Sequence, residues 1–240
     1  MLFDAVLDHP WQGGRLGNPS TGVIETGMPF YRDHVYPRLV KALGNPRPVQ
    51  QLRRQLVPLA SGTVLEIGVG SGANLRYYDP AKVSLLYALE PNPGMRRLAE
   101  LERRRTDIKV EFLDLPGERI PLDDGALDTV VSTFTLCTIP GVSEALRGIT
   151  RVLKPDGELL FLEPSLAADS RVRRWQEWWE PFHHRVFEGL HLTRDIPPLL
   201  TREGFQLQRV SSVYLTAFPK SWAHCCWGAA TLHSEGRGPV

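Results

Sequence analysis

Cysteine is scarce in this chain of 240 residues, which contains only Cys137, Cys225 and Cys226. The three form no Cys-x-x-Cys pair and no even set, so the sequence predicts neither a disulfide framework nor a cysteine-based zinc site. Among the seven histidines, His183 and His184 are adjacent and therefore lack the i, i+4 spacing that directs two imidazoles at one ion. We expect a protein without a metal site in a reducing compartment, the cytoplasm.

The chain also lacks an excess of positive or negative charge and lacks long hydrophobic runs. The 28 basic side chains balance the 27 acidic ones, so the chain has no strong field to attract nucleic acid or an anionic lipid surface. No window comes near the roughly 18 consecutive apolar residues that a spanning helix needs, and the N-terminus has no signal-peptide pattern. We expect a soluble protein with a small-molecule partner, without a nucleic-acid ligand and without a membrane anchor.

The composition is sufficient for a complete hydrophobic core, because 42% of the residues are apolar. Short apolar runs alternate with segments of helical periodicity, which favours an α/β fold with a parallel sheet covered by helices on both faces. The predicted strands are 63–67, 83–89, 108–113, 127–133, 157–163, 205–216 and 222–232, and the predicted helices between them are 73–78, 93–104 and 143–153.

Two segments interrupt this alternation. Residues 9–29 are rich in Gly, Pro, Ser and Thr, and the helical pattern that follows up to residue 58 is broken by Pro46 and Pro48. We therefore expect a flexible segment and helical cap over 1–58 and one domain over 59–240. Within that domain, a helical insert of about 165–200 follows the fifth strand.

A glycine-rich loop comes directly after the first predicted strand. Gly68, Gly70 and Gly72 let the backbone turn sharply and approach a ligand without side chains in the way, and the predicted helix behind them offers free N–H groups. This pattern is typical of a nucleotide-type cofactor site. Because Gly68-x-Gly70-x-x-Ala73 also satisfies a loose dinucleotide fingerprint, the glycines leave NAD open.

Two carboxylates flank this loop. Glu66 lies at the ligand end of a buried strand, where an unpaired charge is costly, so it needs a cationic or hydrogen-bonding partner. The ammonium group of S-adenosylmethionine would provide one, whereas a pyrophosphate would be repelled. Glu90 ends the next strand, 22 residues after Gly68, where an acid accepts both ribose hydroxyls of an adenosine cofactor. Taken singly, each acid also suits a strand end or a helix start.

The chain resembles the class I, seven-strand S-adenosylmethionine-dependent methyltransferases, strongly over residues 60–165. Within them it is most similar to the alkyl thiol methyltransferases and, more distantly, to the quinone-pathway methyltransferases. The resemblance implies a doubly wound, mostly parallel seven-stranded sheet. It rests on Gly72-Ala73-Asn74 with Tyr78, Pro91-Asn92-Pro93, Gly117-Glu118, Leu136-Cys137, Arg151-Val152-Leu153-Lys154-Pro155-x-Gly157 and Gly189-x-x-Leu192-Thr193-Arg194.

Two positions depart from the relatives. Glu163 is followed by Pro164 where they tend to carry a histidine, and Gly189 is followed by Leu190 where they tend to carry a cysteine. In such a fold the adenine lies beside the turn after the third strand, and the loop after the fourth strand flanks the methyl group. The expected cofactor-binding residues are Glu66, Gly68, Gly70, Gly72, Asn74, Glu90, Pro91, Met95, Pro116, Gly117, Glu118, Thr133 and Phe134.

The expected acceptor site rests on the aromatic insert. Trp175 and Trp179 share one face of a helix, which packs in the core or covers the acceptor pocket as a lid. His183 or His184 would then act as the base that deprotonates the acceptor. Tyr31 and Thr135 complete the expected acceptor pocket.

The sequence thus predicts methyl transfer from S-adenosylmethionine to a small apolar metabolite, with a thiol as the first choice. Carbon or oxygen methylation of a quinone-like or phenolic metabolite is the alternative. Two hypotheses from other classes remain, an NAD-dependent oxidoreductase and a non-catalytic scaffold that only binds the cofactor.

Overall fold

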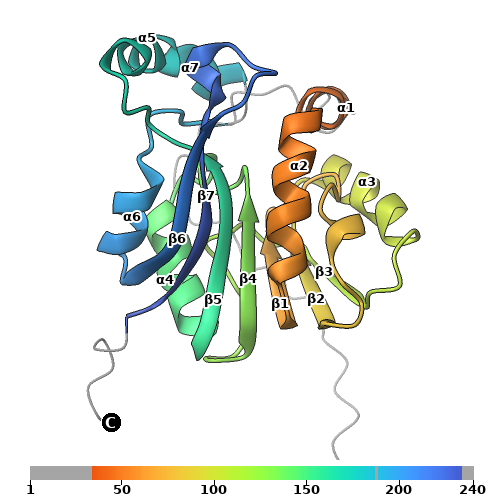
Figure 1. Cartoon of the computed structure of the whole chain (residues 1–240). Helices are drawn as coiled ribbons and strands as arrows, with labels where there is room; N and C mark the ends of the chain where they lie inside the picture. Colours follow the sequence, from red (N-terminus) through yellow and green to blue (C-terminus); the bar gives the residue numbers. More distant parts are fainter. Residues whose placement is uncertain (1–33, 187–188, 234–240) are drawn as a thin grey trace, which may run out of the picture.

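A mixed sheet forms the centre of the computed structural model, which describes residues 34–186 and 189–233 (Figure 1). The strand order is β3-β2-β1-β4-β5-β7-β6. β7 runs antiparallel to both neighbours, and the other four pairs are parallel. This confirms the predicted seven-stranded, mostly parallel sheet. The strands are β1 (Gly62–Ile67), β2 (Val83–Leu89), β3 (Val110–Leu113), β4 (Leu127–Thr133), β5 (Leu153–Pro164), β6 (Phe205–Tyr214) and β7 (His224–Leu232).

Helices cover both faces of the sheet and bury a separate cluster on each. One cluster contains α2 and α3 side chains, and the other contains α4 and α6 side chains. This is the doubly wound arrangement that was predicted. The helices are α1 (Tyr36–Leu43), α2 (Arg47–Leu56), α3 (Pro93–Arg103), α4 (Val142–Val152), α5 (Ser170–Val186), α6 (Ile196–Arg202) and α7 (Lys220–Ala223).

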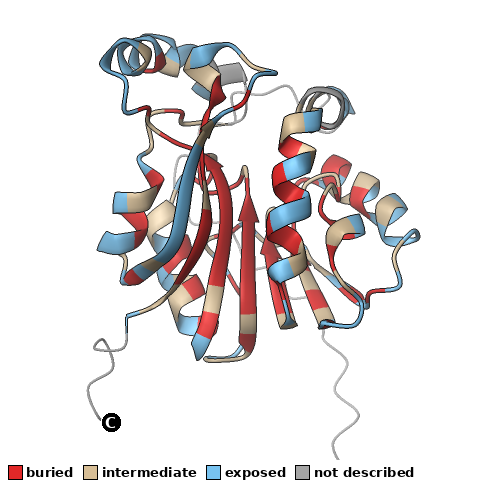
Figure 2. Ribbon diagram, in the orientation of Figure 1, coloured by how far each residue is buried: buried red, intermediate tan, exposed pale blue. Residues whose placement is uncertain are grey.

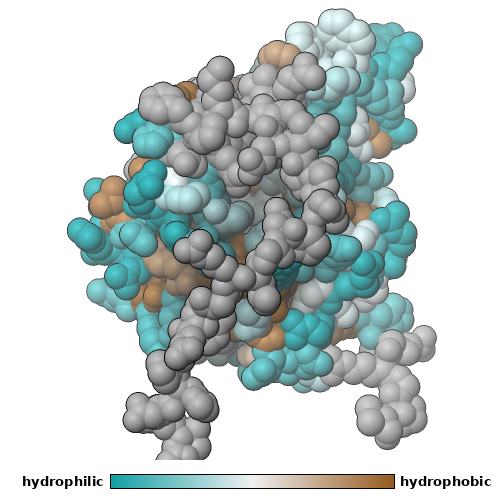
Figure 3. Space-filling model, turned by 180° about the vertical axis from the view of Figure 1, so that it is seen from behind, coloured by the Kyte–Doolittle hydropathy of each residue, from teal (hydrophilic) through white to brown (hydrophobic). Residues whose placement is uncertain are grey.

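The two clusters follow from the period of two in a strand. Val64 contributes to the cluster under α2, and its neighbour Leu65 contributes to the cluster under α4. The central strands are therefore apolar on both faces, and Figure 2 shows them almost wholly buried. The edge strand β6 is mostly exposed. Seen from the opposite side, the described surface mixes hydrophilic and hydrophobic residues (Figure 3).

One predicted helix is wrong. Residues 73–78 form only a single 3₁₀ turn, η3 (Leu75–Tyr77), instead of an α-helix. Asn74 and Tyr78 point their side chains at Glu66, and Pro80 disfavours a helical conformation at the residue before it. The glycine loop is consequently not followed by a helix N-terminus.

Two helices, α1 and α2, precede β1 within the described residues. Pro46 separates α1 from α2, as predicted, whereas Pro48 falls in the first turn of α2, where a missing N–H costs nothing. Tyr31 lies outside the described residues. None of the helices within 34–186 and 189–233 has the length and apolar character needed to cross a membrane.

Candidate active site

A cavity of about 740 Å³ opens at the carboxyl ends of the parallel strands. Its volume lies in the upper part of the range of about 300–1,000 Å³ that is usual for small-molecule sites, so it has room for more than one small molecule. Many of the residues expected to bind the cofactor or acceptor line it. These are Gly68, Gly70, Glu90, Pro91, Met95, Pro116, Gly117, Glu118, Thr133, Phe134 and Thr135.

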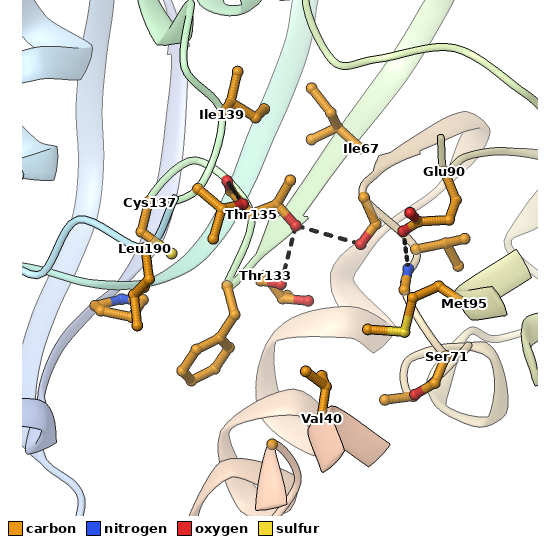
Figure 4. Close-up of a pocket in the computed structure, with 18 of the residues that line it drawn as sticks. Val40, Ile67, Ser71, Glu90, Met95, Thr133, Thr135, Cys137, Ile139 and Leu190 are labelled. Atoms are coloured by element: carbon orange, nitrogen blue, oxygen red, sulfur yellow. Dashed lines mark hydrogen bonds between the residues drawn. The ribbon is translucent and has the colours of Figure 1, made fainter. Parts of the chain in front are cut away.

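The glycine loop takes backbone angles that other residues avoid. Gly68 has φ of 67° and Gly70 has φ of 57°. A Cβ at Gly68 would lie 2.4 Å from the Thr135 side chain, whose hydroxyl donates to the Gly68 carbonyl. The first glycine therefore lets the β1 loop and the loop after β4 meet at the centre of the cavity (Figure 4).

Glu90 holds the same loop from the end of β2. Its Oε2 accepts from the Gly70 N–H at 2.9 Å, and its Oε1 accepts from the Asn92 N–H at 2.8 Å. Asn92 in turn caps α3 by accepting from the N–H groups of Gly94 and Met95. Glu90 also lines the cavity, so it both shapes the loop and faces the ligand space.

The turn after β3 is packed against the loop after β4. A Cβ at Gly117 would lie 2.6 Å from Ile139, so only glycine allows this approach. Glu118 accepts from the Gly141 N–H at 3.1 Å, next to the start of α4. The turn thus forms one end wall of the cavity, with backbone groups and an apolar neighbour side by side.

Glu66 is placed differently from what we expected. It is 1% exposed and does not line the cavity, because its two oxygens accept from Asn74 Nδ2 and from the Tyr78 hydroxyl, each at 2.8 Å. The chain itself supplies the hydrogen-bonding partners that we had assigned to a cofactor. Gly72 and the fully buried Asn74 likewise do not line the cavity. Burial raises the pKa of Glu66 to about 7, although Tyr78, Arg53 and Asn74 oppose this shift.

Arg53 is a site residue that the sequence reasoning missed. It extends from α2 into the cavity, is 6% exposed, and donates from Nη1 to Asn74 Oδ1 at 2.5 Å and to Thr133 Oγ1 at 2.7 Å. Its Nε has no hydrogen-bond partner among the described residues. The signal was an arginine on the apolar stripe of α2, alongside Val49 and Leu56.

A buried carboxylate at the end of β5 shapes the loop after β4. Glu163 is fully buried and accepts from the Ser132 hydroxyl and from the N–H groups of Thr135, Leu136 and Cys137. Burial raises its pKa, and these donors oppose the shift.

Phe134, just before these donors, has φ of 57°, which makes it the only non-glycine residue with positive φ in the described chain. The Arg53 guanidinium lies 5.6 Å from its ring centroid.

The residues expected at the acceptor site lie elsewhere or outside the described set. Trp175 and Trp179 are 57% and 36% exposed and do not line the cavity, because α5 buries Gln176 instead of its tryptophan face. His184 is exposed and also outside the cavity lining. The structure does not describe the side chain of His183 or any part of Tyr31, so the proposed role of each stays a prediction.

Apolar residues from other segments form that side of the cavity. They come from the stretch before α6 and from the connection between β6 and β7. In Figure 4, Cys137 and Leu190 lie on one side of Thr133 and Thr135, whereas Glu90, Met95 and Ser71 lie on the other. The apolar residues in these two segments are Leu190, Leu192, Ala217, Phe218, Pro219 and Trp222. Within 34–186 and 189–233, no group of three or more His, Cys, Asp or Glu residues is arranged to hold a metal ion.

Comparisons with known proteins agree with this geometry. The profile of a family described as "Methyltransferase domain" matches residues 65–161. The chain is 31% identical over 170 residues to the human thiol S-methyltransferase TMT1A, covering 69% of this chain and 67% of that protein. The chain belongs to the class I S-adenosylmethionine-dependent methyltransferases.

A second relative supports this assignment, and a solved structure supports the fold. The rat thiol S-methyltransferase TMT1B is 36% identical over 138 residues, which cover 55% of each protein. A solved S-adenosylmethionine-dependent methyltransferase from Aquifex aeolicus superposes with a TM-score of 0.60 at 20% identity, covering 82% of this chain and 98% of that one. The match to TMT1B thus spans little more than half of that relative's length.

The cofactor of this methyltransferase is S-adenosylmethionine, and the cavity suits it. The loop at Gly68 and Gly70 provides close backbone approach, Glu90 provides acceptor oxygens, and Arg53 provides a buried cation. These groups match a ligand with ribose hydroxyls and a carboxylate. S-adenosylmethionine therefore accounts for the glycine pattern that had left NAD as an alternative.

Proposed function

We propose that this methyltransferase transfers the methyl group to the thiol of a small apolar metabolite. One observation carries the proposal: a single cavity has a polar side beside the glycine loop and an apolar side beside Leu190, Phe218 and Trp222. The similarity to thiol S-methyltransferases points to the same acceptor chemistry. A thiol suits an apolar wall, since sulfur is polarizable and weakly hydrated compared with a hydroxyl.

The polar side is the proposed place of the cofactor. Glu90 would accept from the ribose hydroxyls, and the turn at Pro116–Glu118 would hold the adenine between backbone groups and Ile139. Arg53 would bind the carboxylate of the methionine part, because it is the buried cation on this cavity and its Nη1 is already oriented by Asn74 and Thr133.

The chain's contribution to the reaction would be alignment and exclusion of water. The cofactor supplies a methyl group that its sulfonium centre has already activated. Phe134 and the segment around Leu190 would orient the acceptor toward that centre and remove solvent from the line of attack. A thiol with a pKa of about 8.5 has a usable thiolate fraction near neutral pH, so it demands little from a base.

A panel of acceptors tests the proposal. The wild-type protein is incubated with S-adenosylmethionine and with thiols, phenols or quinols, and release of S-adenosylhomocysteine is measured. We expect release with apolar thiols. Release with phenols or quinols alone would replace the proposal by oxygen or carbon methylation, and tight cofactor binding without turnover on any acceptor would indicate a scaffold.

A further inference from the structure

The connection between β6 and β7 projects over the acceptor side of the cavity. β7 pairs with both β5 and β6, with Pro164 opposite Cys225 and Tyr214 opposite His224, so β6 ends at the same edge of the sheet as β5. The connection, residues 215–223, is closed at its base by a hydrogen bond from the Leu215 N–H to the Ala223 carbonyl at 2.8 Å. Sheet register therefore delivers this segment to the cavity mouth.

The segment has a defined internal structure. The Phe218 N–H donates to the Leu215 carbonyl at 3.2 Å, and the Trp222 N–H donates to the Pro219 carbonyl at 2.8 Å. Phe218 also packs against the core cluster on the α2 face of the sheet. A turn and the short helix α7 thus bring Phe218 and Trp222 into the cavity lining together with Ala217.

A second segment of the cavity lining, around Leu190, is also anchored by hydrogen bonds. The His191 N–H donates to the Cys137 carbonyl at 2.9 Å, and the Leu192 N–H donates to Glu180 Oε2 at 3.1 Å. Leu190 and Leu192 both line the cavity. Cys137 lies beside Leu190 (Figure 4), and burial raises the pKa of its thiol well above the usual value, so this side chain is neutral and adds no charge.

We propose that residues 217–222 form the specificity loop of this enzyme, with Phe218 and Trp222 binding the apolar body of the acceptor and Ala217 leaving the space that limits its size. The inference rests on the proposed methyl transfer and deepens it. The acceptor class is a thiol on an aromatic ring or a compact alkyl group. Two aromatic side chains and two leucines in the lining of one cavity match such a flat apolar body better than a long polar chain.

Two substitutions that change the size of the pocket in opposite directions test the loop. Trp222→Ala enlarges the space and Ala217→Phe fills it, and the side chain of Ala217 is exposed, so its replacement disturbs no core packing. The control is Trp178→Ala, which removes a tryptophan that is 67% exposed and outside the cavity lining. The probes are thiophenol and 2-naphthalenethiol, and the readout is the ratio of their kcat/KM values.

We expect this ratio, 2-naphthalenethiol over thiophenol, to rise about ten-fold in Trp222→Ala and to fall about ten-fold in Ala217→Phe. The change should appear mainly in KM for the thiol. The dissociation constant of S-adenosylhomocysteine, measured by calorimetry, should stay within about two-fold in both variants, and Trp178→Ala should leave the ratio unaltered. An unchanged ratio in both loop variants, or a parallel loss of S-adenosylhomocysteine affinity, would overturn the inference.

A binding measurement separates this inference from the proposed function. Methyl phenyl sulfide and methyl naphthyl sulfide are titrated into each protein in the presence of S-adenosylhomocysteine. If the two loop variants change sulfide affinity as expected but the wild type methylates no thiol, the proposed thiol methylation is contradicted and the specificity loop is supported. Should the wild type bind neither sulfide, the loop assignment is wrong.

Discussion

The two sides of the cavity are built by different means. On the cofactor side, side chains and backbone groups from β1, β2 and α2 are joined by hydrogen bonds, such as those of Glu90 with the Gly70 and Asn92 N–H groups. On the proposed acceptor side, apolar residues from irregular segments, such as Leu190 and Phe218, line the cavity. The cofactor side is built at strand ends, whereas the proposed acceptor side is built from connections that can change length and sequence without disturbing the sheet.

This difference explains how one fold serves many acceptors. A cofactor shared by the whole family needs the same polar groups in every member, and strand ends position such groups reproducibly. Acceptors differ in shape, and replaceable apolar loops adapt to them. Substitutions on the cofactor side should therefore change stability or cofactor affinity, and those on the acceptor side should change only acceptor kinetics.

The largest effect is expected in the polar network beneath the cofactor side. Glu66→Ala should lower the free energy of unfolding by about 3–5 kcal/mol at pH 8, because it leaves the buried Arg53 charge uncompensated and removes the acceptor of Asn74 and Tyr78. Urea unfolding followed by circular dichroism measures this. Glu66→Gln is the matched control and should lose less, since it keeps the shape and one acceptor; equal losses would mean that the carboxylate charge matters and side-chain volume does not.

The same residue gives a pH dependence with a definite sign. The pKa of Glu66 is about 7 in the fold and about 4.3 in an unfolded chain. The folded state therefore binds more protons between these values, so the contribution of Glu66 to stability falls as the pH rises from about 4 through 7 and is constant above. Relative to Glu66→Gln, the wild type should lose about 4 kcal/mol across this window. A flat difference would show that Glu66 is ionised throughout.

A smaller effect, on affinity, is expected at Arg53. Arg53→Met should weaken S-adenosylmethionine binding by about 2–3 kcal/mol, because the methionine carboxylate loses its charged partner. Calorimetry should compare S-adenosylmethionine with its decarboxylated form. The wild type should prefer the former and the variant should bind both alike, whereas an unchanged preference would place the carboxylate elsewhere.

A somewhat smaller loss of cofactor affinity is expected when Glu90 is replaced. Glu90→Ala should weaken cofactor binding by about 1–3 kcal/mol, since the ribose hydroxyls lose a charged acceptor and the Gly70 N–H loses its partner. Binding of 2′-deoxy and unmodified S-adenosylhomocysteine to both proteins isolates the ribose contribution. If the wild type does not distinguish the two nucleosides, Glu90 only shapes the loop.

The smallest effect is expected outside the cavity, at a residue that the sequence nominated as a base. His184→Asn should change kcat/KM for an apolar thiol by less than about 0.5 kcal/mol, because its exposed side chain does not line the cavity. Steady-state kinetics at pH 6 and pH 9 checks this. A loss that is large at pH 6 and vanishes at pH 9 would restore the histidine as the base.

Much of the architecture could be predicted because it depends on local patterns. Alternating apolar runs placed β2 and β4 at their observed bounds, and the spacing from Gly68 to Glu90 placed an acid at the cavity. Positions that depend on contacts between distant segments could not be predicted. The tryptophans of α5 illustrate this, since their spacing indicated a shared helix face but not whether that face is buried.

What the sequence determined by itself is thus the sheet, the glycine loop and a site for a nucleotide-type cofactor, because each is encoded in residues that are neighbours along the chain. Tertiary structure alone decided that Glu66 is satisfied internally by Asn74 and Tyr78, and that Arg53 reaches the cavity from α2. Tertiary structure also put Trp222 rather than Trp179 in the lining of the cavity. The reason is physical: a buried charge or aromatic ring takes whichever partner the packed chain brings to it, and spacing in sequence does not encode that partner.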